Sequence, residues 1–326
     1  MDYREYIKKH LIKNTDRILE FGPLIRPLVS KKDYPGIKFA DVRSTEDIRK
    51  LYTSNDYLQA TGLTVDINSV AEIDYVVSDS YSKIFKNEKK FDVVYLSHVI
   101  EHMPDIISFF NDVKSILKKE SKLILIYPDA RYCFDHFRNG STFIDAYDVY
   151  RDRSRSSNRV LDFVYNVVGE NNPLFFWSSN NQGDILPKND FKKSLKAYEK
   201  ALCNELPDDT HFWPFSDYQF VKFLYDMDRA GLLDFSIKDF YPTQENQQEF
   251  MIVLTPKTKK EIDYMNYKKI LNKTNPIIKQ NKLMKEIKDL KTKNNDLTLE
   301  LNAIHNSKKW QYVKKIALIR NKIIFK

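Results

Sequence analysis

Cysteine, glycine and long apolar runs are scarce in this chain of 326 residues. The only cysteines, Cys133 and Cys203, are too few for a disulfide framework or a cysteine-based metal centre, so we expect reduced thiols. Seven glycines leave little material for a full glycine-rich phosphate loop. No apolar run reaches the roughly 18 residues of a membrane span, and the charged N-terminus lacks the apolar core of a signal peptide. These absences predict a cytoplasmic protein.

Basic residues are concentrated near the end of the chain. Residues 256–326 hold 19 Lys and Arg but only 6 Asp and Glu, while the whole chain has a net charge of +8, so residues 1–255 are net acidic. A basic segment favours an anionic membrane surface or an acidic partner, whereas the acidic body gives nucleic acid binding no support. We therefore divide the chain into residues 1–255 and 256–326 and expect no nucleic acid partner.

The middle of the chain has the pattern of a strand, a crossover helix and a second strand. The expected elements are a strand at Phe91–Leu96, a helix at Ile106–Leu117, a charged connector at Lys118–Lys122 and a strand at Leu123–Tyr127. Such units build parallel sheets, and ligands bind beyond the carboxyl ends of their strands. The polar residues that follow the two strands are His98, Glu101, His102, Asp129, Arg131 and Tyr132.

The order of the remaining elements favours an α/β fold. Three strand candidates, Asp16–Phe21, Ile37–Val42 and Asp74–Val77, precede this unit, and they complete a series of strand–helix repeats. Two later candidates, Ile237–Tyr241 and Glu249–Thr255, are expected to close the sheet as an antiparallel pair. The pattern therefore predicts a doubly wound, largely parallel sheet of seven strands.

The ends of the first two predicted strands carry Glu20, Gly22 and Asp41. A glycine after the first strand lets the backbone approach a nucleotide-type ligand, and an acidic residue about 20 positions later can bind ribose hydroxyls. The alternative is a Gly-Pro turn followed by an ordinary capping or turn aspartate. The residues alone leave both interpretations open.

Three motifs occur together with Asp41. They are EFGPLIRPLV at residues 20–29, SHVIEH at 97–102 and YPDARYCFDHFR at 127–138. Over residues 14–255 the chain resembles the class I S-adenosylmethionine-dependent methyltransferases. More narrowly, it is similar to the bacterial branch associated with glycosyltransferases and surface-polysaccharide (capsule or O-antigen) biosynthesis. The resemblance implies a Rossmann-like sheet of seven strands, S-adenosyl-L-methionine as the cofactor, and a sugar or glycan as the methyl acceptor.

The resemblance also implies a cofactor site along the strand ends. Glu20 would lie near the ammonium group of the cofactor, and Asp41 would bind its ribose hydroxyls. Because the second and third glycines of the usual loop are missing, Arg26 is a candidate partner for the methionine carboxylate. The implied cofactor residues are Glu20, Gly22, Arg26, Asp41, Asp79, Ser80, Ser97 and His98.

His98 is the first candidate for a catalytic base, because its near-neutral pKa suits removal of a proton from the acceptor. Asp129 and His211 are the two other candidates. Residues 129–215 lack the strand–helix rhythm, so we interpret them as an insertion after the fifth strand that forms a lid and binds the acceptor. The alternative is an ordinary satellite core around the aromatic residues next to Trp177.

A metal site is an alternative for the second motif. If residues 98–102 are helical, His98, Glu101 and His102 share one face and can bind a divalent metal ion. The spacing also matches the reversed zincin motif, but the surrounding strand–helix pattern gives a protease no support. We favour the other interpretation, in which Glu101 and His102 brace the loop over the cofactor and no metal is needed.

The basic segment contains two series of residues spaced seven apart. They are Leu283, Leu290, Leu297 and Ile304, and Ile287, Asn294 and Leu301. Leucine in one series and a single asparagine in the other are typical of a dimeric coiled coil in which the asparagine fixes the register. The pattern therefore predicts a homodimer through residues 283–304, and the alternative is a solvated helix packed on the body.

Residues 308–326 mix apolar and aromatic side chains with seven Lys and Arg. This composition predicts an amphipathic segment that binds an anionic membrane or docks a glycosyltransferase, which would hold the protein peripherally at the inner face of the membrane. The degenerate glycine loop leaves a second hypothesis for the whole chain. In it, the protein is an inactive methyltransferase-like scaffold that dimerises and docks partners through its coiled coil.

Overall fold

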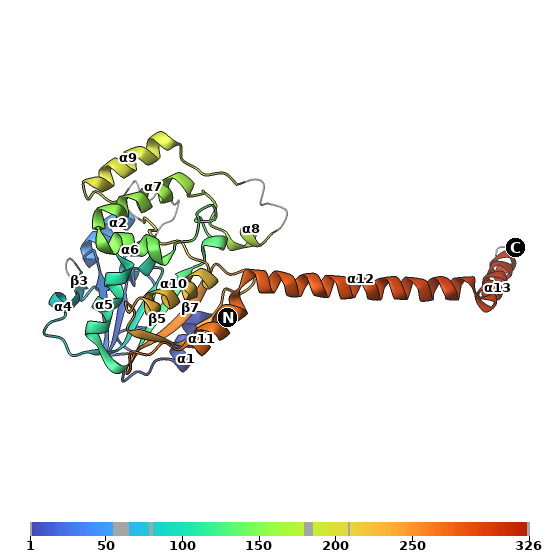
Figure 1. Ribbon diagram of the computed structural model, residues 1–326, viewed down its shortest axis with the longest axis horizontal. Coiled ribbons are helices and arrows are strands. Elements are labelled where there is room, and N and C mark those ends of the chain that lie inside the picture. Colours follow the sequence, from blue (N-terminus) through green and yellow to red (C-terminus); the bar gives the residue numbers. More distant parts are fainter. Residues whose placement is uncertain (1, 55–64, 78–80, 179–184, 208, 325–326) are drawn as a thin grey trace. The chain divides into compact units, whose positions relative to one another are not determined.

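The structure is a computed structural model that describes residues 2–54, 65–77, 81–178, 185–207 and 209–324. The chain divides into two compact units, Met1–Leu271 and Asn272–Lys326. In the first unit, helices surround a central sheet, as Figure 1 shows. The second unit contains the two last helices of the chain.

The sheet has seven strands in the order β3-β2-β1-β4-β5-β7-β6. Strands β1 to β5 are parallel, and β7 runs antiparallel to both of its neighbours, β5 and β6. This confirms the predicted α/β fold with a seven-stranded sheet and a closing antiparallel pair. The strands are β1 Ile18–Phe21, β2 Ile37–Asp41, β3 Tyr75–Val76, β4 Phe91–Ser97, β5 Leu117–Pro128, β6 Phe235–Tyr241 and β7 Glu249–Pro256.

Helices precede, connect and follow these strands. Those of the first unit are α1 Tyr3–His10, α2 Thr45–Thr53, α4 Tyr81–Ile84, α5 Ile106–Ile116, α6 Phe143–Arg151, α7 Ser156–Asn166, α8 Pro173–Trp177, α9 Phe191–Leu202, α10 Asp217–Arg229 and α11 Tyr264–Thr274. Helices α6 to α10 lie between β5 and β6 in the chain. Of these, α6 to α9 lie within the predicted insertion at residues 129–215, whose role as a lid stays a prediction.

Strand β5 begins earlier than the sequence predicts. The expected charged connector Lys118–Lys122 is wrong, because these residues lie within the strand. Phe91 of β4 pairs with Leu117, and Val93 pairs with Lys122. The residues of β5 between Leu117 and Lys122 therefore form a bulge in the pairing of the two strands. One charged side chain of this segment has a partner on the neighbouring strand, because Lys118 forms an ion pair with Asp92 of β4 at 2.6 Å. Three consecutive charged residues therefore do not interrupt a strand when they sit at a bulge.

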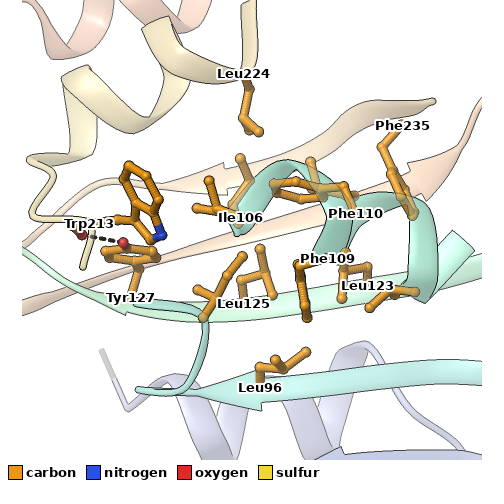
Figure 2. Packing of buried hydrophobic residues seen from close by; sticks show 14 of the residues in the cluster. Leu96, Ile106, Phe109, Phe110, Leu123, Leu125, Tyr127, Trp213, Leu224 and Phe235 are labelled. Atoms are coloured by element: carbon orange, nitrogen blue, oxygen red, sulfur yellow. Dashed lines mark hydrogen bonds between the residues drawn. The ribbon is translucent and has the colours of Figure 1, made fainter. Parts of the chain in front are cut away.

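Alternate residues of the central strands enter two different apolar clusters. On β5, Leu123, Leu125 and Tyr127 belong to the cluster that contains buried residues of α5 and α10. Ile124 and Ile126 belong to the cluster that contains α1. A strand covered on both faces needs apolar residues at every position, which explains the uninterrupted apolar run that the sequence shows. Figure 2 shows the first cluster, with α5 packed against the strands.

Two hydrogen bonds fix the segment before α10 to the sheet and to the loop after β4. The hydroxyl of the buried Tyr127 donates to the carbonyl of Trp213, as Figure 2 shows. The Trp213 indole N–H donates to the carbonyl of Met103 at 2.6 Å. Trp213 is fully buried, so a segment remote in sequence is held next to the loop that follows β4.

The second unit contains α12, Pro276–Asn306, and α13, Lys308–Ile324. No residue of α12 is buried, and the apolar residues of both heptad series are exposed. The predicted boundary at residue 255 lies before α11, in which Tyr267 and Ile270 are buried in the core of the first unit. The coiled coil and the homodimer stay predictions. Among the described helices, none has both the length and the apolar character that crossing a bilayer requires.

Candidate functional site

The strand order reverses between β1 and β4, next to each other in the middle of the sheet. In open α/β sheets the crevice at such a reversal, beyond the carboxyl ends of the strands, is where ligands bind. The pairing registers place Gly22 beside Ser97 on one side and beside Asp41 on the other. Three of the predicted cofactor residues are therefore brought together at this edge.

Gly22 occupies a position where only glycine fits. Its φ is +64°, in the left-handed region, and its N–H donates to the carbonyl of Ala40 at 2.9 Å. A Cβ at this position would lie 2.7 Å from Cγ2 of Val99, in the loop after β4. The loops that follow β1 and β4 thus approach each other closely across the reversal point.

The loop after β1 is held by two charged side chains. The buried carboxylate of Glu20 accepts the backbone N–H of Leu28 at 2.9 Å. The guanidinium of Arg4 donates to the carbonyls of Arg26 and Pro27. Burial raises the pKa of Glu20 to about 8, although the Leu28 N–H and the charge of Arg4 act in the opposite direction. The side chain of Arg26 itself is exposed.

Asp41 ends β2 and is only 8% exposed. Its carboxylate accepts the backbone N–H of Arg43 at 2.9 Å, so it serves a local turn as well as facing the edge of the sheet. Burial raises its pKa, and Arg43 acts in the opposite direction. The predicted adenine-side residues Asp79 and Ser80 lie outside the described residues.

His98 follows β4 with a φ of +53°, which a residue other than glycine seldom adopts. Its Nε2 lies 2.7 Å from Oε2 of Glu249, the first residue of β7. Burial lowers the pKa of His98, but the hydrogen bond to Glu249 and the charges of Glu101 and Glu249 outweigh it and raise that pKa above its ordinary value. His98 is therefore a histidine with a carboxylate partner at the sheet edge, as a base for proton transfer requires.

Glu249 is a site residue that the sequence analysis missed. The last strand runs antiparallel, so its first residue, not its last, lies at the edge where the parallel strands end. Glu249 pairs there with Pro128 at the end of β5. The sequence analysis could have found Glu249, because it predicted that the last two strands form an antiparallel pair. An antiparallel last strand places its first residue, Glu249, at this edge.

The alternative in which His98, Glu101 and His102 share one helix face, which the sequence analysis did not favour, does not hold in the structure. His98 precedes the short 3-10 helix Ile100–His102 and has a left-handed backbone, so the segment is not a continuous α-helix. The Nδ1 of His98 is 3.9 Å from Oε1 of Glu101. Within the described residues, the group close enough to share a metal ion is Glu101, His102 and His211.

This second polar cluster lies in the interior, next to His98. Glu101 is fully buried, and in the described part of the chain neither of its carboxylate oxygens has a hydrogen-bond partner. Oε1 of Glu101 is 3.9 Å from Nε2 of His211, which is 5% exposed. Burial lowers the pKa of His102, and the neighbouring His211 acts in the same direction. The predicted base His211 thus lies in this interior cluster.

Asp135 and Arg138 support His211 from behind. Nδ1 of His211 is 2.6 Å from Oδ2 of Asp135, whose other oxygen accepts from Arg138 at 2.8 Å. Arg138 also donates to the carbonyl of His211 at 2.6 Å. Burial acts to raise the pKa of Asp135, but His211 and Arg138 outweigh it and hold that pKa at about 2. His211 is therefore fixed in orientation by a buried, ionised carboxylate.

Asp129, the third candidate base, is fully buried in an ion pair. Its carboxylate accepts from Arg131 at 2.6 and 2.8 Å and from the hydroxyl of Thr243 at 2.6 Å. Arg131 also pairs with Asp217 at the start of α10 at 2.6 Å. This arrangement ties the loop after β5 to α10, and it does not favour Asp129 as a base.

A surface pocket of about 650 Å³ lies between the loop before α6 and helix α10. None of the predicted site residues lines it. The reversal point of the sheet, and not this pocket, is therefore the candidate site.

A comparison with protein families matches part of the chain. Residues 3–158 match the family model described as a methyltransferase domain. This match covers slightly less than half of the chain and includes strands β1 to β5. It supports a class I methyltransferase domain in this part of the protein. No curated protein matches the sequence.

Several solved structures are similar to the chain. The mitomycin 7-O-methyltransferase MmcR is 12% identical, with a TM-score of 0.34, covering 74% of this chain and 49% of its own. PigF with SAH is 13% identical, with a TM-score of 0.34 and coverage of 79% and 62%. A Zn-dependent alcohol dehydrogenase from Rhodobacter sphaeroides is 12% identical, with a TM-score of 0.39 and coverage of 79% and 91%. The chain thus spans about half of MmcR, and these scores are too low to bear on function.

The raised pKa of Glu20 predicts a pH-dependent stability. Because this pKa is about 8 in the folded chain and 4.5 in the unfolded chain, the folded state keeps a proton that the unfolded state loses. The free energy of unfolding therefore falls between about pH 5 and pH 8, by up to about 1.4 kcal/mol per unit from this group. Glu20→Gln should flatten that slope in urea titrations followed by circular dichroism.

The exposed Glu120 provides a matched control, since Glu120→Gln should leave the slope of the wild-type chain unchanged. An equally steep slope in Glu20→Gln and in the wild-type chain would contradict the raised pKa.

Proposed function

We propose that this protein transfers a methyl group from S-adenosyl-L-methionine to a hydroxyl, amine or phosphate group of a sugar or glycan intermediate in cell-surface polysaccharide synthesis. The observation that carries the proposal is the reversal point of the sheet, where Asp41, Gly22 and Ser97 lie at the ends of three adjacent strands. Neighbouring strands lie about 4.8 Å apart, so these residues span about 10 Å, a length suited to a nucleoside. The family match over the same strands supports this assignment.

The residues present fit the proposed cofactor. At Gly22 the space of a side chain is taken by Cγ2 of Val99, so glycine is what lets the loops after β1 and β4 meet at this edge. The Asp41 carboxylate can accept hydrogen bonds from two ribose hydroxyls, and the exposed guanidinium of Arg26 can pair with a carboxylate. A cation placed near Glu20 would favour its ionised form and offset the effect of burial on its pKa. When bound, the cofactor supplies an electrophilic methyl group on a sulfonium.

His98 is the base in this proposal. If its Nε2–H donates to Glu249, Nδ1 carries the lone pair that can take a proton from the acceptor. The carboxylate of Glu249 then stabilises the imidazolium that forms. The main contribution of the protein to the rate is alignment of the acceptor, and the base adds a smaller factor.

Aromatic residues after β5 support a sugar acceptor. The rings of Tyr132 and Trp177 stack with centroids 4.0 Å apart, and the Arg131 guanidinium lies 5.1 Å from the Tyr132 centroid. Both aromatic side chains are partly exposed. Aromatic faces suit the apolar faces of sugar rings, whereas the Arg131 guanidinium is already paired with Asp129 and Asp217. The partly exposed Tyr132 and Trp177 are therefore the acceptor surface in this proposal.

The first test is calorimetric titration with S-adenosylmethionine and S-adenosylhomocysteine. Asp41→Ala should weaken binding at least tenfold, or about 1.4 kcal/mol, because hydrogen bonds to a charged group are lost. Asp33→Ala, which removes an exposed carboxylate from the loop after β1, should bind like the wild-type chain. A folded chain that gives no heat with either ligand would instead favour the inactive scaffold.

The pairing of His98 with Glu249 predicts the pH profile of the reaction. Because Glu249 raises the pKa of His98, Glu249→Gln should lower that pKa and move the acid limb of the rate profile to lower pH. The rate is measured as S-adenosylhomocysteine release with sugar phosphates and nucleotide sugars as acceptors, and the His98 pKa by NMR titration of its imidazole. Glu245→Gln, an exposed neighbour in the same hairpin, is the control. An NMR shift without movement of the acid limb would exclude His98 as the base.

The proposal includes dimerisation through residues 283–304. Each apolar member of the two heptad series is at least 37% exposed in the single chain, so a seam of this length needs a partner to bury it. A second copy fits, because Asn294 would meet Asn294 of the partner and fix the register. Residues 308–326 would then hold the dimer at an anionic membrane surface, with docking of a glycosyltransferase as the alternative.

Charge in the seam should prevent dimerisation. We expect the full chain to be a dimer in sedimentation equilibrium and Leu290→Lys to be a monomer. Leu299→Lys is a matched control, because Leu299 is 67% exposed but lies outside both heptad series. A wild-type monomer at all concentrations, or equal effects of the two substitutions, would contradict the coiled coil.

A further inference from the structure

The interior cluster contains one carboxylate and two imidazoles in a compact arrangement. One ligand-capable atom from each of Glu101, His102 and His211 lies within 4.8 Å of the others. Oε1 of Glu101 and Nε2 of His211 are 3.9 Å apart. Ligand atoms around a tetrahedral ion with bonds of 2.0–2.1 Å are about 3.3 Å apart, so binding an ion requires these side chains to move closer by up to about 1.5 Å.

Both imidazoles already have the outer contacts that orient metal ligands. Nδ1 of His102 lies 3.0 Å from the carbonyl of Thr210, and Nδ1 of His211 lies 2.6 Å from the carboxylate of Asp135. Because these oxygens can only accept a hydrogen bond, each Nδ1 carries a proton, and in the neutral imidazole each Nε2 keeps its lone pair. Such contacts fix the tautomer and ring orientation of histidines that bind metals.

Glu101 provides the independent observation. It is fully buried, and within the described residues both of its oxygens lack a hydrogen-bond partner. A buried carboxylate without a partner is costly unless a cation is present. The buried guanidinium of Arg138 is engaged by Asp135 and Asp162, at 2.8 and 2.9 Å. The two Glu101 oxygens are therefore buried acceptors for which the described residues provide no hydrogen-bond donor.

We propose that Glu101, His102 and His211 bind a divalent transition-metal ion, with zinc as the best fit. Two imidazoles and one carboxylate are a donor set that zinc accepts, and a fourth position remains for water or an acceptor oxygen. Three hydrogen bonds already join the segments that the ion would bridge: Phe212 N–H to the Glu101 carbonyl at 2.8 Å, and the bonds made by His102 and Trp213. The ion fastens residues 210–213 to the loop after β4.

This site differs from the one that the sequence suggested. His98 is not a member, because its Nε2 is bonded to Glu249 at the sheet edge. Oε1 of Glu101 lies 3.9 Å from His98 as well as 3.9 Å from His211. The ion would therefore sit behind His98 and position the loop, while the base remains free to act.

The experiment measures metal directly in the full chain, expressed without a histidine tag. Elemental analysis after purification without chelators should give about one zinc per chain, and cobalt substitution should give the visible absorption of a histidine-ligated tetrahedral ion. Glu101→Gln and His211→Gln should weaken zinc at least tenfold in competition with a coloured chelator. His98→Gln and His10→Gln, which change a neighbouring and an exposed histidine, should bind zinc like the wild-type chain.

Stability gives a second measurement. Removal of the ion with a chelator should lower the Tm of the wild-type chain and of His98→Gln but not that of Glu101→Gln. Absence of stoichiometric metal in the wild-type chain, or unchanged zinc affinity in a folded Glu101→Gln, would overturn the proposal. Neither result depends on cofactor binding, since S-adenosylhomocysteine titration reports on Asp41 and the metal assays do not.

Discussion

The structure depends on the close contact between the loops that follow β1 and β4. At the reversal point of the sheet, Gly22 lies so near Val99 that no side chain fits between them. This contact sets the distance between the strand end that offers backbone to a ligand and the strand end that carries His98. Hydrogen bonds with Glu20 and Arg4 fix the loop after β1, which is one of the two sides of this contact. Alignment of two substrates requires such fixed loops.

Three buried carboxyl groups of the structure differ in how far their charge is compensated by neighbouring groups. Asp135 is buried together with Arg138 and His211, and its pKa falls to about 2. Glu20 is buried with only a backbone N–H and a more distant arginine, and its pKa rises to about 8. Glu101 has neither kind of partner among the described residues. The three carboxylates thus form a series from fully compensated to uncompensated, and ligands belong at the uncompensated end.

The sequence was sufficient for the parts of the fold that depend on local pattern. Uninterrupted apolar runs identified β4 and β5, because strands covered on both faces have no polar positions. The sequence was not sufficient where backbone geometry or distant segments decide the structure. The left-handed turn at His98 prevents residues 98–102 from forming one helix face, and Glu249 lies at the site only because β7 is antiparallel. His211 was named from the sequence, but its position beside Glu101 depends on a fold that joins residues far apart. No local pattern encodes such a meeting.

The antiparallel direction of β7 separates the two halves of the site along the chain. All residues proposed to bind the cofactor lie before residue 100, whereas Glu249 belongs to a hairpin near the end of the first unit. During synthesis, the strand ends around Gly22 can form long before His98 meets its carboxylate partner. The proposed cofactor residues and the carboxylate partner of the proposed base are therefore encoded in segments that lie far apart in the chain.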